Sequence, residues 1–288
     1  MTRRVVRAAP AKLNLFLEVL SRRPDGYHEL DAVFAAIDLH DTVELTPADE
    51  ISIEVSGGAA PTDVTNLAWR AASEFFGAAG GGVHIRLTKR IPNGAGLGGG
   101  SSDAAAVLLG LHALFDRPID EAALLDLAGR LGADVPFFLT GGLALCGGIG
   151  DIVRPVEPAP ISTFLLISPD FGCETPQIFR ALSDDLNSAG LIEKPHSARV
   201  FLEKYLAKSP SGDAVPYFNR LQAAAEQYDP RLRAIRAAAE ARFGLRFTMT
   251  GSGSSYFAEV HDDFGNPSAM WSVDGIGAIP RIVQTASR

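Results

Sequence analysis

The chain is richest in glycine at Pro92-Asn93-Gly94-Ala95-Gly96-Leu97-Gly98-Gly99-Gly100-Ser101-Ser102-Asp103, which has five glycines in seven consecutive residues. This glycine segment follows an alternating apolar run, 83–87, that predicts a strand, and precedes an apolar run, 104–114, that predicts a helix. Successive amides at a helix start can curl around a phosphate, where the helix dipole also favours negative charge. A flexible turn is the alternative, but ordering five glycines costs backbone entropy that close ligand approach readily offsets. We therefore interpret the segment as a phosphate-binding loop.

Three better-known phosphate motifs fit this segment poorly. Residues 94–99 have the Gly-x-Gly-x-x-Gly spacing of dinucleotide-binding proteins, but the acids about 20 positions later, Asp120 and Glu121, begin a predicted helix instead of ending a strand. A Walker A loop requires Lys-Ser or Lys-Thr directly after its final glycine, whereas Gly100 is followed by Ser101. Asp-Phe-Gly occurs twice, but without the His-Arg-Asp triplet of protein kinases. A nicotinamide-dependent oxidoreductase is left as a weak alternative.

Hydrophobic periodicity predicts mixed strands and helices around the glycine segment. The expected strands are 11–19, with one face in the core, 32–39, 42–45, 83–87 and 164–167; the expected helices are 66–76, 104–114, 120–131 and several between 175 and 243. Residues 245–250 and 256–260 flank the loop 251–255, which predicts either a strand-loop-strand or a loop-helix feature. Gly132 is expected to stop the preceding helix in a left-handed conformation, and Pro136 favours an extended Val135. Asp134 should then lie on a short, constrained connector. Prolines at 155, 158 and 160 predict a domain boundary, with domains 1–155 and 156–288.

Composition narrows the possible classes of protein. The 288 residues predict about two domains. The 26 basic and 34 acidic residues give a net charge of −8, which opposes general binding to nucleic acid or to an anionic membrane. The sequence shows neither a membrane-spanning stretch nor a secretory signal core, so a cytoplasmic location is expected. Cys146 and Cys173 lack partners at ligand spacing and are expected to be core thiols. The oligomeric state is left open.

Lys12, Asn14 and Asp134 are candidates for chemistry. Lys12 and Asn14 lie two residues apart on a predicted strand and therefore share a face. On spacing alone, a solvent-facing strand explains them as well as an active site does. A solvated loop carboxylate is likewise the commoner fate of a residue such as Asp134. Further motifs are needed to choose between these interpretations.

Three segments resemble the motifs of the GHMP kinases, the superfamily of galactokinase, homoserine kinase, mevalonate kinase and phosphomevalonate kinase. They are residues 9–15, Ala-Pro-Ala-Lys-Leu-Asn-Leu; residues 94–103 of the glycine segment; and residues 249–254, Met-Thr-Gly-Ser-Gly-Ser. Residues 25–28, 131–136 and 174–179 are similar to the branch that phosphorylates a cytidylyl sugar alcohol. The resemblance extends over nearly the whole chain. It departs at Asn219-Arg220, where such kinases often have Asn-Asp, and after residue 260.

This resemblance implies an α+β, two-domain GHMP kinase fold. The N-terminal domain should resemble domain 2 of ribosomal protein S5 and the C-terminal domain a ferredoxin-like sandwich, with the active site between them. It also implies ATP-dependent phosphorylation of the 2-hydroxyl of 4-diphosphocytidyl-2-C-methyl-D-erythritol, a step of the non-mevalonate isoprenoid pathway. The expected ligands are thus ATP, accompanied by Mg²⁺, and the cytidylyl sugar alcohol. The sequence does not assign the metal ligands.

The resemblance also implies roles for individual residues. Asp134 would be the catalytic base, and Lys12 its charged partner. The implied ATP-binding residues are Asn66, near adenine, and Pro92, Asn93, Gly94, Ala95, Gly96, Leu97, Gly98, Gly99, Gly100, Ser101 and Ser102, around the phosphates. The implied acceptor-binding residues are Asn14, Tyr27, His28, Phe34, Asp134, Thr175 and Phe179. A homoserine or mevalonate-type kinase and a non-catalytic nucleotide sensor are the alternatives, although retention of Lys12 and Asp134 argues against a sensor.

Overall fold

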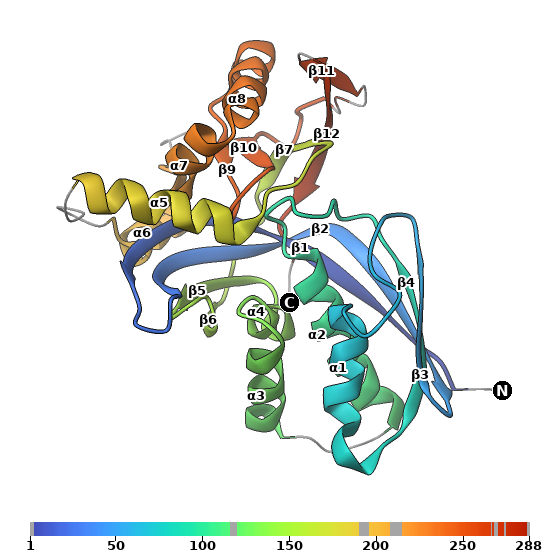
Figure 1. The fold of residues 1–288 in the computed structure, drawn as a ribbon. Helices are drawn as coiled ribbons and strands as arrows, with labels where there is room; N and C mark the ends of the chain where they lie inside the picture. Colours follow the sequence, from blue (N-terminus) through green and yellow to red (C-terminus); the bar gives the residue numbers. More distant parts are fainter. Residues whose placement is uncertain are drawn as a thin grey trace.

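The computed structural model describes residues 3–115, 120–189, 196–207, 215–265, 267, 270–273 and 275–286. They form two sheets with associated helices (Figure 1). The first half contains strands β1 (Val5–Arg22), β2 (His28–Ala48), β3 (Ile51–Ser56), β4 (Gly82–Thr88), β5 (Leu143–Gly147) and β6 (Ile152–Val156), and helices α1 (Leu67–Phe76), α2 (Gly99–Phe115), α3 (Glu121–Leu131) and α4 (Val135–Thr140). The second half contains strands β7 (Thr163–Pro169), β8 (Phe218–Asn219), β9 (Thr248–Met249), β10 (Tyr256–Val260), β11 (Trp271–Val273) and β12 (Ile276–Gln284), and helices α5 (Thr175–Ala189), α6 (Ala198–Ala207), α7 (Leu221–Tyr228) and α8 (Pro230–Phe243).

The first sheet has the strand order β3-β4-β2-β1-β8, and β5 and β6 extend it from β2. Helices α1 to α4 gather on one side of it (Figure 1). The strands predicted at 32–39 and 42–45 are one strand, β2, which pairs with β1 along most of its length. From Ala11 to Val19 every residue of β1 is buried. The prediction that only one face of this strand lies in the core is therefore wrong: its polar side chains are also covered.

The second sheet has the order β11-β12-β7-β10-β9, with α7 and α8 beside it (Figure 1). Every residue of β7 is buried, as the apolar run at 164–167 predicts. The two halves share hydrogen bonds, because β8 pairs in parallel with β1 and Thr285 forms a bridge with Ile37. The chain passes from the first sheet to the second between β6 and β7. The division at residue 155 stays a prediction, with β8 contributed to the first sheet by the second half.

Local backbone structure differs from the prediction around Asp134. Val135 is the first residue of α4 and not extended, because a proline in the first helical turn needs no hydrogen bond from its missing N–H. Asp134 is the helix N-cap residue, with φ −82° and ψ −13°. Gly132 has φ 170° and ψ 156°, so the predicted left-handed stop is also wrong. Helix α2 begins earlier than predicted, at Gly99, inside the glycine segment.

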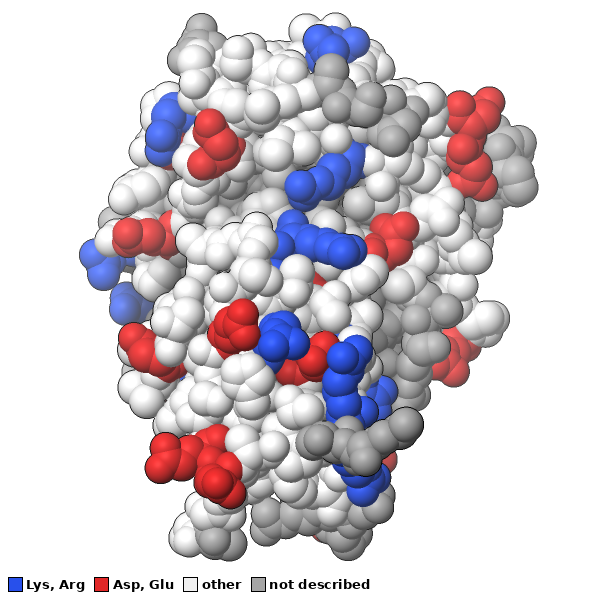
Figure 2. Space-filling model, turned by 90° about the vertical axis from the view of Figure 1, so that its right-hand side faces the viewer, with Lys and Arg blue, Asp and Glu red and all other residues white. Residues whose placement is uncertain are grey.

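None of the described helices combines the length and the apolarity needed to cross a membrane. On the face shown in Figure 2, Lys and Arg side chains are interspersed with Asp and Glu. The part of this face that the structure describes therefore presents no broad basic surface.

Candidate active site

A cavity of about 800 Å³ is lined by residues from both halves of the chain. Its walls come from β1, the start of β2, the glycine segment, the turn before α4, the starts of α5 and α7, and the loop between β9 and β10. The predicted site residues that line it are Lys12, Asn14, Tyr27, His28, Phe34, Pro92, Asn93, Gly94, Ala95, Gly96, Leu97, Gly98, Gly99, Gly100, Ser101, Asp134, Thr175 and Phe179. Asn66 and Ser102 are not among the lining residues.

Lys12 is held among polar and aromatic groups on the cavity wall. Its side chain is only 5% exposed, and its Nζ donates a hydrogen bond to Asn14 Oδ1 at 2.5 Å. Nζ also lies 3.6 Å from Asp134 Oδ2 and 4.7 Å from the centre of the Phe34 ring. Asp134 keeps 31% of its side chain exposed. A fixed positive charge therefore stands beside a carboxylate that a ligand can reach.

The glycine segment brings backbone amides and a helix start to the same cavity. Gly94, Gly96 and Gly98 have φ values of +63°, +74° and +72°, a conformation that favours glycine. A Cβ atom on Gly96 would lie 2.1 Å from the carbonyl oxygen of Thr250, so this position is also closed to side chains. The first residues of the 17-residue helix α2 line the cavity, and the positive end of its dipole therefore lies there. This arrangement suits a phosphate group.

Aromatic and imidazole rings line another part of the cavity. The rings of His28 and Phe179 are 4.9 Å apart, and Tyr27 is 59% exposed. Burial, together with the positive charge of Arg22, lowers the pKa of His28. At neutral pH its imidazole is therefore uncharged, with one donor and one acceptor nitrogen. Thr175 Oγ1 lies 2.7 Å from Ser252 Oγ and joins the start of α5 to the β9–β10 loop.

Asn66 and Ser102 have other surroundings. The side chain of Asn66 caps α1: its oxygen accepts a hydrogen bond from the Ala68 amide at 2.9 Å, and its nitrogen donates to Pro61 O at 2.7 Å. The next residue, Leu67, does line the cavity. Ser102 is 1% exposed, and its hydroxyl has no hydrogen-bond partner among the described residues.

Sequence reasoning missed several lining residues. Gly251 and Ser252 belong to the motif at residues 249–254, which by resemblance implies no role for either of them, whereas Arg22 and Arg180 carry no periodic or motif signal. The cysteines are both free. Cys146 is buried as predicted, but Cys173 is partly exposed. Burial raises the pKa of both thiols, that of Cys173 to about 11, so neither is a reactive thiolate at neutral pH.

Comparison with known proteins identifies the relatives of this chain. Residues 66–142 match the family described as GHMP kinases N terminal domain. Two proteins named 4-diphosphocytidyl-2-C-methyl-D-erythritol kinase, from Thermus thermophilus and Carboxydothermus hydrogenoformans, are 42% and 39% identical to the chain over 254 residues. Each alignment covers 87% of this chain and 86% of the relative. The chain belongs to the 4-diphosphocytidyl-2-C-methyl-D-erythritol kinase family.

Solved structures agree with this membership. A crystal structure of 4-(cytidine 5'-diphospho)-2C-methyl-D-erythritol kinase has a TM-score of 0.78 and 38% identity, covering 98% of this chain and 100% of that one. A homoserine kinase from Cytophaga hutchinsonii has a TM-score of 0.64 at 19% identity, covering 98% of this chain and 95% of its own. That second likeness concerns the fold alone. The predicted α+β GHMP kinase fold is confirmed, and the nicotinamide-dependent alternative is wrong for this kinase family.

Proposed function

We propose that the chain transfers the γ-phosphoryl group of ATP to the 2-hydroxyl of 4-diphosphocytidyl-2-C-methyl-D-erythritol, a step of the non-mevalonate isoprenoid pathway. The carrying observation is the 3.6 Å contact between Lys12 Nζ and Asp134 Oδ2 in a cavity shared with the glycine segment and the His28–Phe179 pair. Phosphoryl transfer depends mainly on alignment of two substrates and on stabilisation of charge. A carboxylate, an ammonium group and a phosphate cradle in one cavity supply those requirements.

Asp134 acts as the general base in this proposal. Its carboxylate accepts a hydrogen bond from the acceptor hydroxyl and takes the proton as that oxygen bonds to the γ-phosphorus. The bond between the γ-phosphorus and the β,γ-bridging oxygen breaks, and ADP leaves. Such a base contributes roughly 10² to 10⁴ in rate. Lys12 orients the Asp134 carboxylate and stabilises negative charge that develops on the phosphoryl oxygens.

The glycine segment holds the nucleotide phosphates through its amides, and Mg²⁺ accompanies the nucleotide. No group of three or more His, Cys, Asp and Glu side chains within the described residues is arranged to hold a metal ion. Mg²⁺ commonly binds through substrate phosphates, waters and one or two protein oxygens, so it does not require such a group. The Ser101 hydroxyl, on the cavity wall, and the buried Ser102 hydroxyl suit this ion, which would neutralise phosphate charge.

The aromatic part of the cavity binds the cytidine of the acceptor. Tyr27 and Phe179 offer ring faces for stacking on cytosine, and the uncharged imidazole of His28 lies beside Phe179 on the same wall of the cavity. Asn14, Phe34 and Thr175 complete the contacts with the sugar alcohol. Asn66 supports the adenine side through the position of α1 and Leu67, since its own polar atoms bind backbone.

A coupled assay of ADP release over a panel of alcohols tests the proposal. The panel contains methylerythritol with and without its cytidine diphosphate, homoserine and mevalonate. We expect the cytidylyl acceptor to have the highest kcat/KM, by roughly tenfold or more over methylerythritol alone. Indistinguishable constants for the two methylerythritol acceptors would refute the acceptor assignment even if ATP is consumed. Absence of ADP release with every alcohol would favour a nucleotide sensor.

A further inference from the structure

Asn219 is a buried amide with every hydrogen-bonding group in use. Its Nδ2 donates to the carbonyl oxygens of Met249, at 2.7 Å, and Gly251, at 2.8 Å. Its Oδ1 accepts a hydrogen bond from the Leu221 amide at the start of α7, at 2.9 Å. A primary amide has two donor hydrogens, and here both bind the backbone on either side of Thr250. Asn219 therefore fixes the entry to the β9–β10 loop, residues 250–255, relative to α7.

Thr250 carries this constraint to β1. Its fully buried hydroxyl accepts a hydrogen bond from the Asn14 amide at 3.0 Å. Its one proton faces two acceptors, Asn14 Oδ1 at 3.3 Å and Gly96 O at 3.4 Å. That same Oδ1 accepts the hydrogen bond from Lys12 Nζ. The position of Thr250 thus sets both the backbone and the side-chain oxygen of the residue that receives the Lys12 ammonium group.

Arg220, the residue after Asn219, also contacts β1. Asn219 is paired in register with Leu17, and the Arg220 amide donates to Leu17 O at 2.8 Å. The Arg220 guanidinium holds both oxygens of the fully buried Glu18 carboxylate, at 2.6 and 2.7 Å. Strand β1, the β8–α7 junction and the β9–β10 loop therefore form a closed ring of buried contacts. None of the three segments can shift without breaking a bond to the next.

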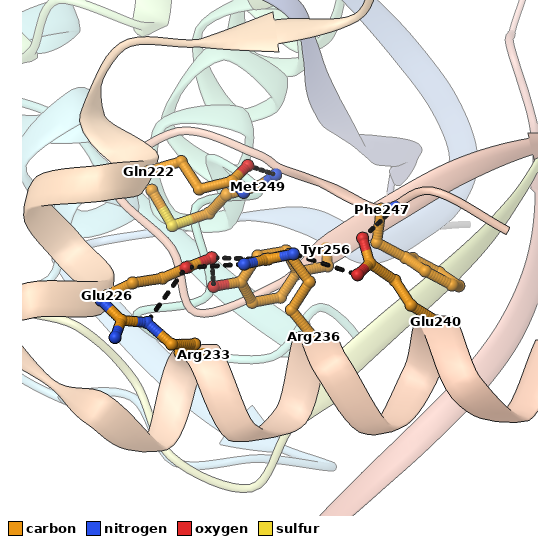
Figure 3. Close-up of polar contacts among 8 residues, drawn as sticks. All are labelled: Gln222, Glu226, Arg233, Arg236, Glu240, Phe247, Met249 and Tyr256. Atoms are coloured by element: carbon orange, nitrogen blue, oxygen red, sulfur yellow. Dashed lines mark hydrogen bonds and ion pairs between the residues drawn. The ribbon is translucent and has the colours of Figure 1, made fainter.

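Helix α7 also holds the two strands beside this loop through contacts outside the ring (Figure 3). Gln222 Oε1 accepts a hydrogen bond from the Met249 amide at 2.9 Å. Glu226 accepts hydrogen bonds from Tyr256, at 3.1 Å, and from Arg236, at 2.7 and 3.0 Å. The attachment of β9 and β10 to α7 therefore does not depend on Asn219 alone. A Gln222 variant can loosen that attachment without removing a bond of the ring.

We propose that Asn219 is a positioning residue for phosphoryl transfer, acting through Thr250 and Asn14 on the ammonium group of Lys12. The inference rests on the proposed function of Lys12 and adds a residue from the second half of the chain to it. Asn219 does not touch either substrate in this proposal. It fixes where Lys12 stands relative to Asp134, so its loss misplaces the charge more than it weakens binding.

Asn219→Asp tests the contact between Asn219 and the backbone beside Thr250. The carboxylate can still accept the hydrogen bond from the Leu221 amide, but it cannot donate to the carbonyl oxygens of Met249 and Gly251. We expect kcat to fall about tenfold to a hundredfold, as a small misplacement of reacting groups can do, with the KM for ATP changed much less. Thr250→Val should act in the same direction, and Thr250→Ser, which keeps the hydroxyl, should restore most of kcat. The double variant Asn219→Asp/Thr250→Val should be no slower than the slower single variant.

Gln222→Ala is the matched control. It removes a hydrogen bond between α7, the helix that follows Asn219, and Met249 of β9, which Asn219 also contacts. We expect a lower melting temperature with wild-type kcat. An equal loss of kcat in this control, or full additivity in the double variant, would overturn the proposal. If Asn219→Asp does not fold, Asn219→Ser, which keeps one donor, provides the test and should have an intermediate kcat; a wild-type kcat for it would overturn the proposal.

Hydrogen exchange at the Asn14 amide gives a readout independent of catalysis. Exchange should become faster in Asn219→Asp and Thr250→Val and stay unchanged in Gln222→Ala, because only the first two disturb the acceptor of that amide. Unchanged exchange in Asn219→Asp would contradict the proposed connection from Asn219 through Thr250 to Asn14. A wild-type protein that transfers no phosphoryl group would contradict the proposed function, whereas an active wild type with an unaffected Asn219→Asp variant would contradict only this inference.

Discussion

Asp134 is the residue on which the proposed reaction depends most directly. Its carboxylate stays accessible while its partner Lys12 is almost completely buried, so the ion pair does not block a hydroxyl from approaching. Asp134→Asn preserves shape but removes the base, and we predict a fall in kcat of roughly 10² to 10⁴. Steady-state kinetics and calorimetry should show dissociation constants for ATP and the acceptor close to wild type. Equal losses of binding and turnover would assign Asp134 a binding role instead.

The proposed contribution of Tyr27 to acceptor binding can be measured by truncating its side chain. The residue is 59% exposed and lines the cavity, so Tyr27→Ala removes a stacking face without opening the core. We predict a rise in KM for the cytidylyl acceptor of about tenfold to a hundredfold, with little change for ATP. Tyr228→Ala is the matched control, because Tyr228 is 56% exposed and does not line the cavity. Similar effects of the two substitutions would remove Tyr27 from cytidine recognition.

At the scale of elements, the contact between β1 and β8 depends on a buried charge. Arg220 lowers the pKa of Glu18 against the opposing effect of burial, with help from the amides of His196 and Val19. Because the pKa of Glu18 is lower in the folded chain, its ionisation stabilises the fold at pH values above 4.5, the pKa of this carboxyl group in the unfolded chain. That stabilisation is lost as the pH falls through the lower pKa of the folded state. Removing Arg220 leaves a buried charge without its guanidinium partner, which is costly only while Glu18 is ionised.

We therefore predict that Arg220→Ala lowers the free energy of unfolding by about 3 kcal/mol at pH 7 and by less below pH 4.5. Denaturant titrations at both pH values measure this difference. Adding Glu18→Gln to Arg220→Ala should recover part of the loss, because the unpaired charge is gone. Arg199→Ala, which breaks an exposed pair with Glu203, should cost about 0.5 kcal/mol or less. A loss for Arg220→Ala that is the same at both pH values would show that packing, and not charge, joins the strands.

Local chemistry made some elements predictable and left others hidden. Helices α1 and α3 agree with the predicted ranges 66–76 and 120–131 to within one residue, and the first residue of each range, Asn66 or Asp120, is the N-cap. The extension of β1 to Val5 and Arg22 depends on pairing with β2, which local periodicity does not encode. The two-residue strand β8 has no periodic signal of its own and exists through its contact with β1.

The candidate site divides in the same way. The positions of Lys12, Asp134 and the glycine segment were predictable because they belong to motifs that resemble a known family. Thr250 lies inside such a motif, but its bond to Asn14 joins residues 236 positions apart and becomes visible only in the fold. In the sequence, Asn219 stands out only as part of the departure from the family pattern at residues 219–220. Arg22 and Arg180 reach the cavity from elements whose arrangement no local pattern specifies.

Across the whole molecule, the cavity requires the two halves of the chain to keep a fixed arrangement. Residues of β1 and the glycine segment form it together with the starts of α5 and α7 and the β9–β10 loop. The halves are joined by the β1–β8 pairing, by the Ile37–Thr285 bridge and by the hydrogen bond from the Ala286 amide to Ala36 O. If these contacts couple the halves strongly, neither should remain folded once the other has unfolded.

The two tryptophans allow this coupling to be measured, because Trp69 lies in α1 of the first half and Trp271 in β11 of the second. Both are partly buried, so the fluorescence of each should change when its own half unfolds. Denaturant titrations of Trp69→Phe and Trp271→Phe are each followed by the fluorescence of the remaining tryptophan. Circular dichroism of the same two variants measures how much each substitution itself changes the stability. Once that change is subtracted, we predict the same midpoint and the same m-value for the two probes. A cooperative unit loses all its structure in one transition and exposes one total surface, which sets a single slope. Separate midpoints for the two probes would instead mean that the halves unfold independently and that the cavity is assembled between two autonomous domains.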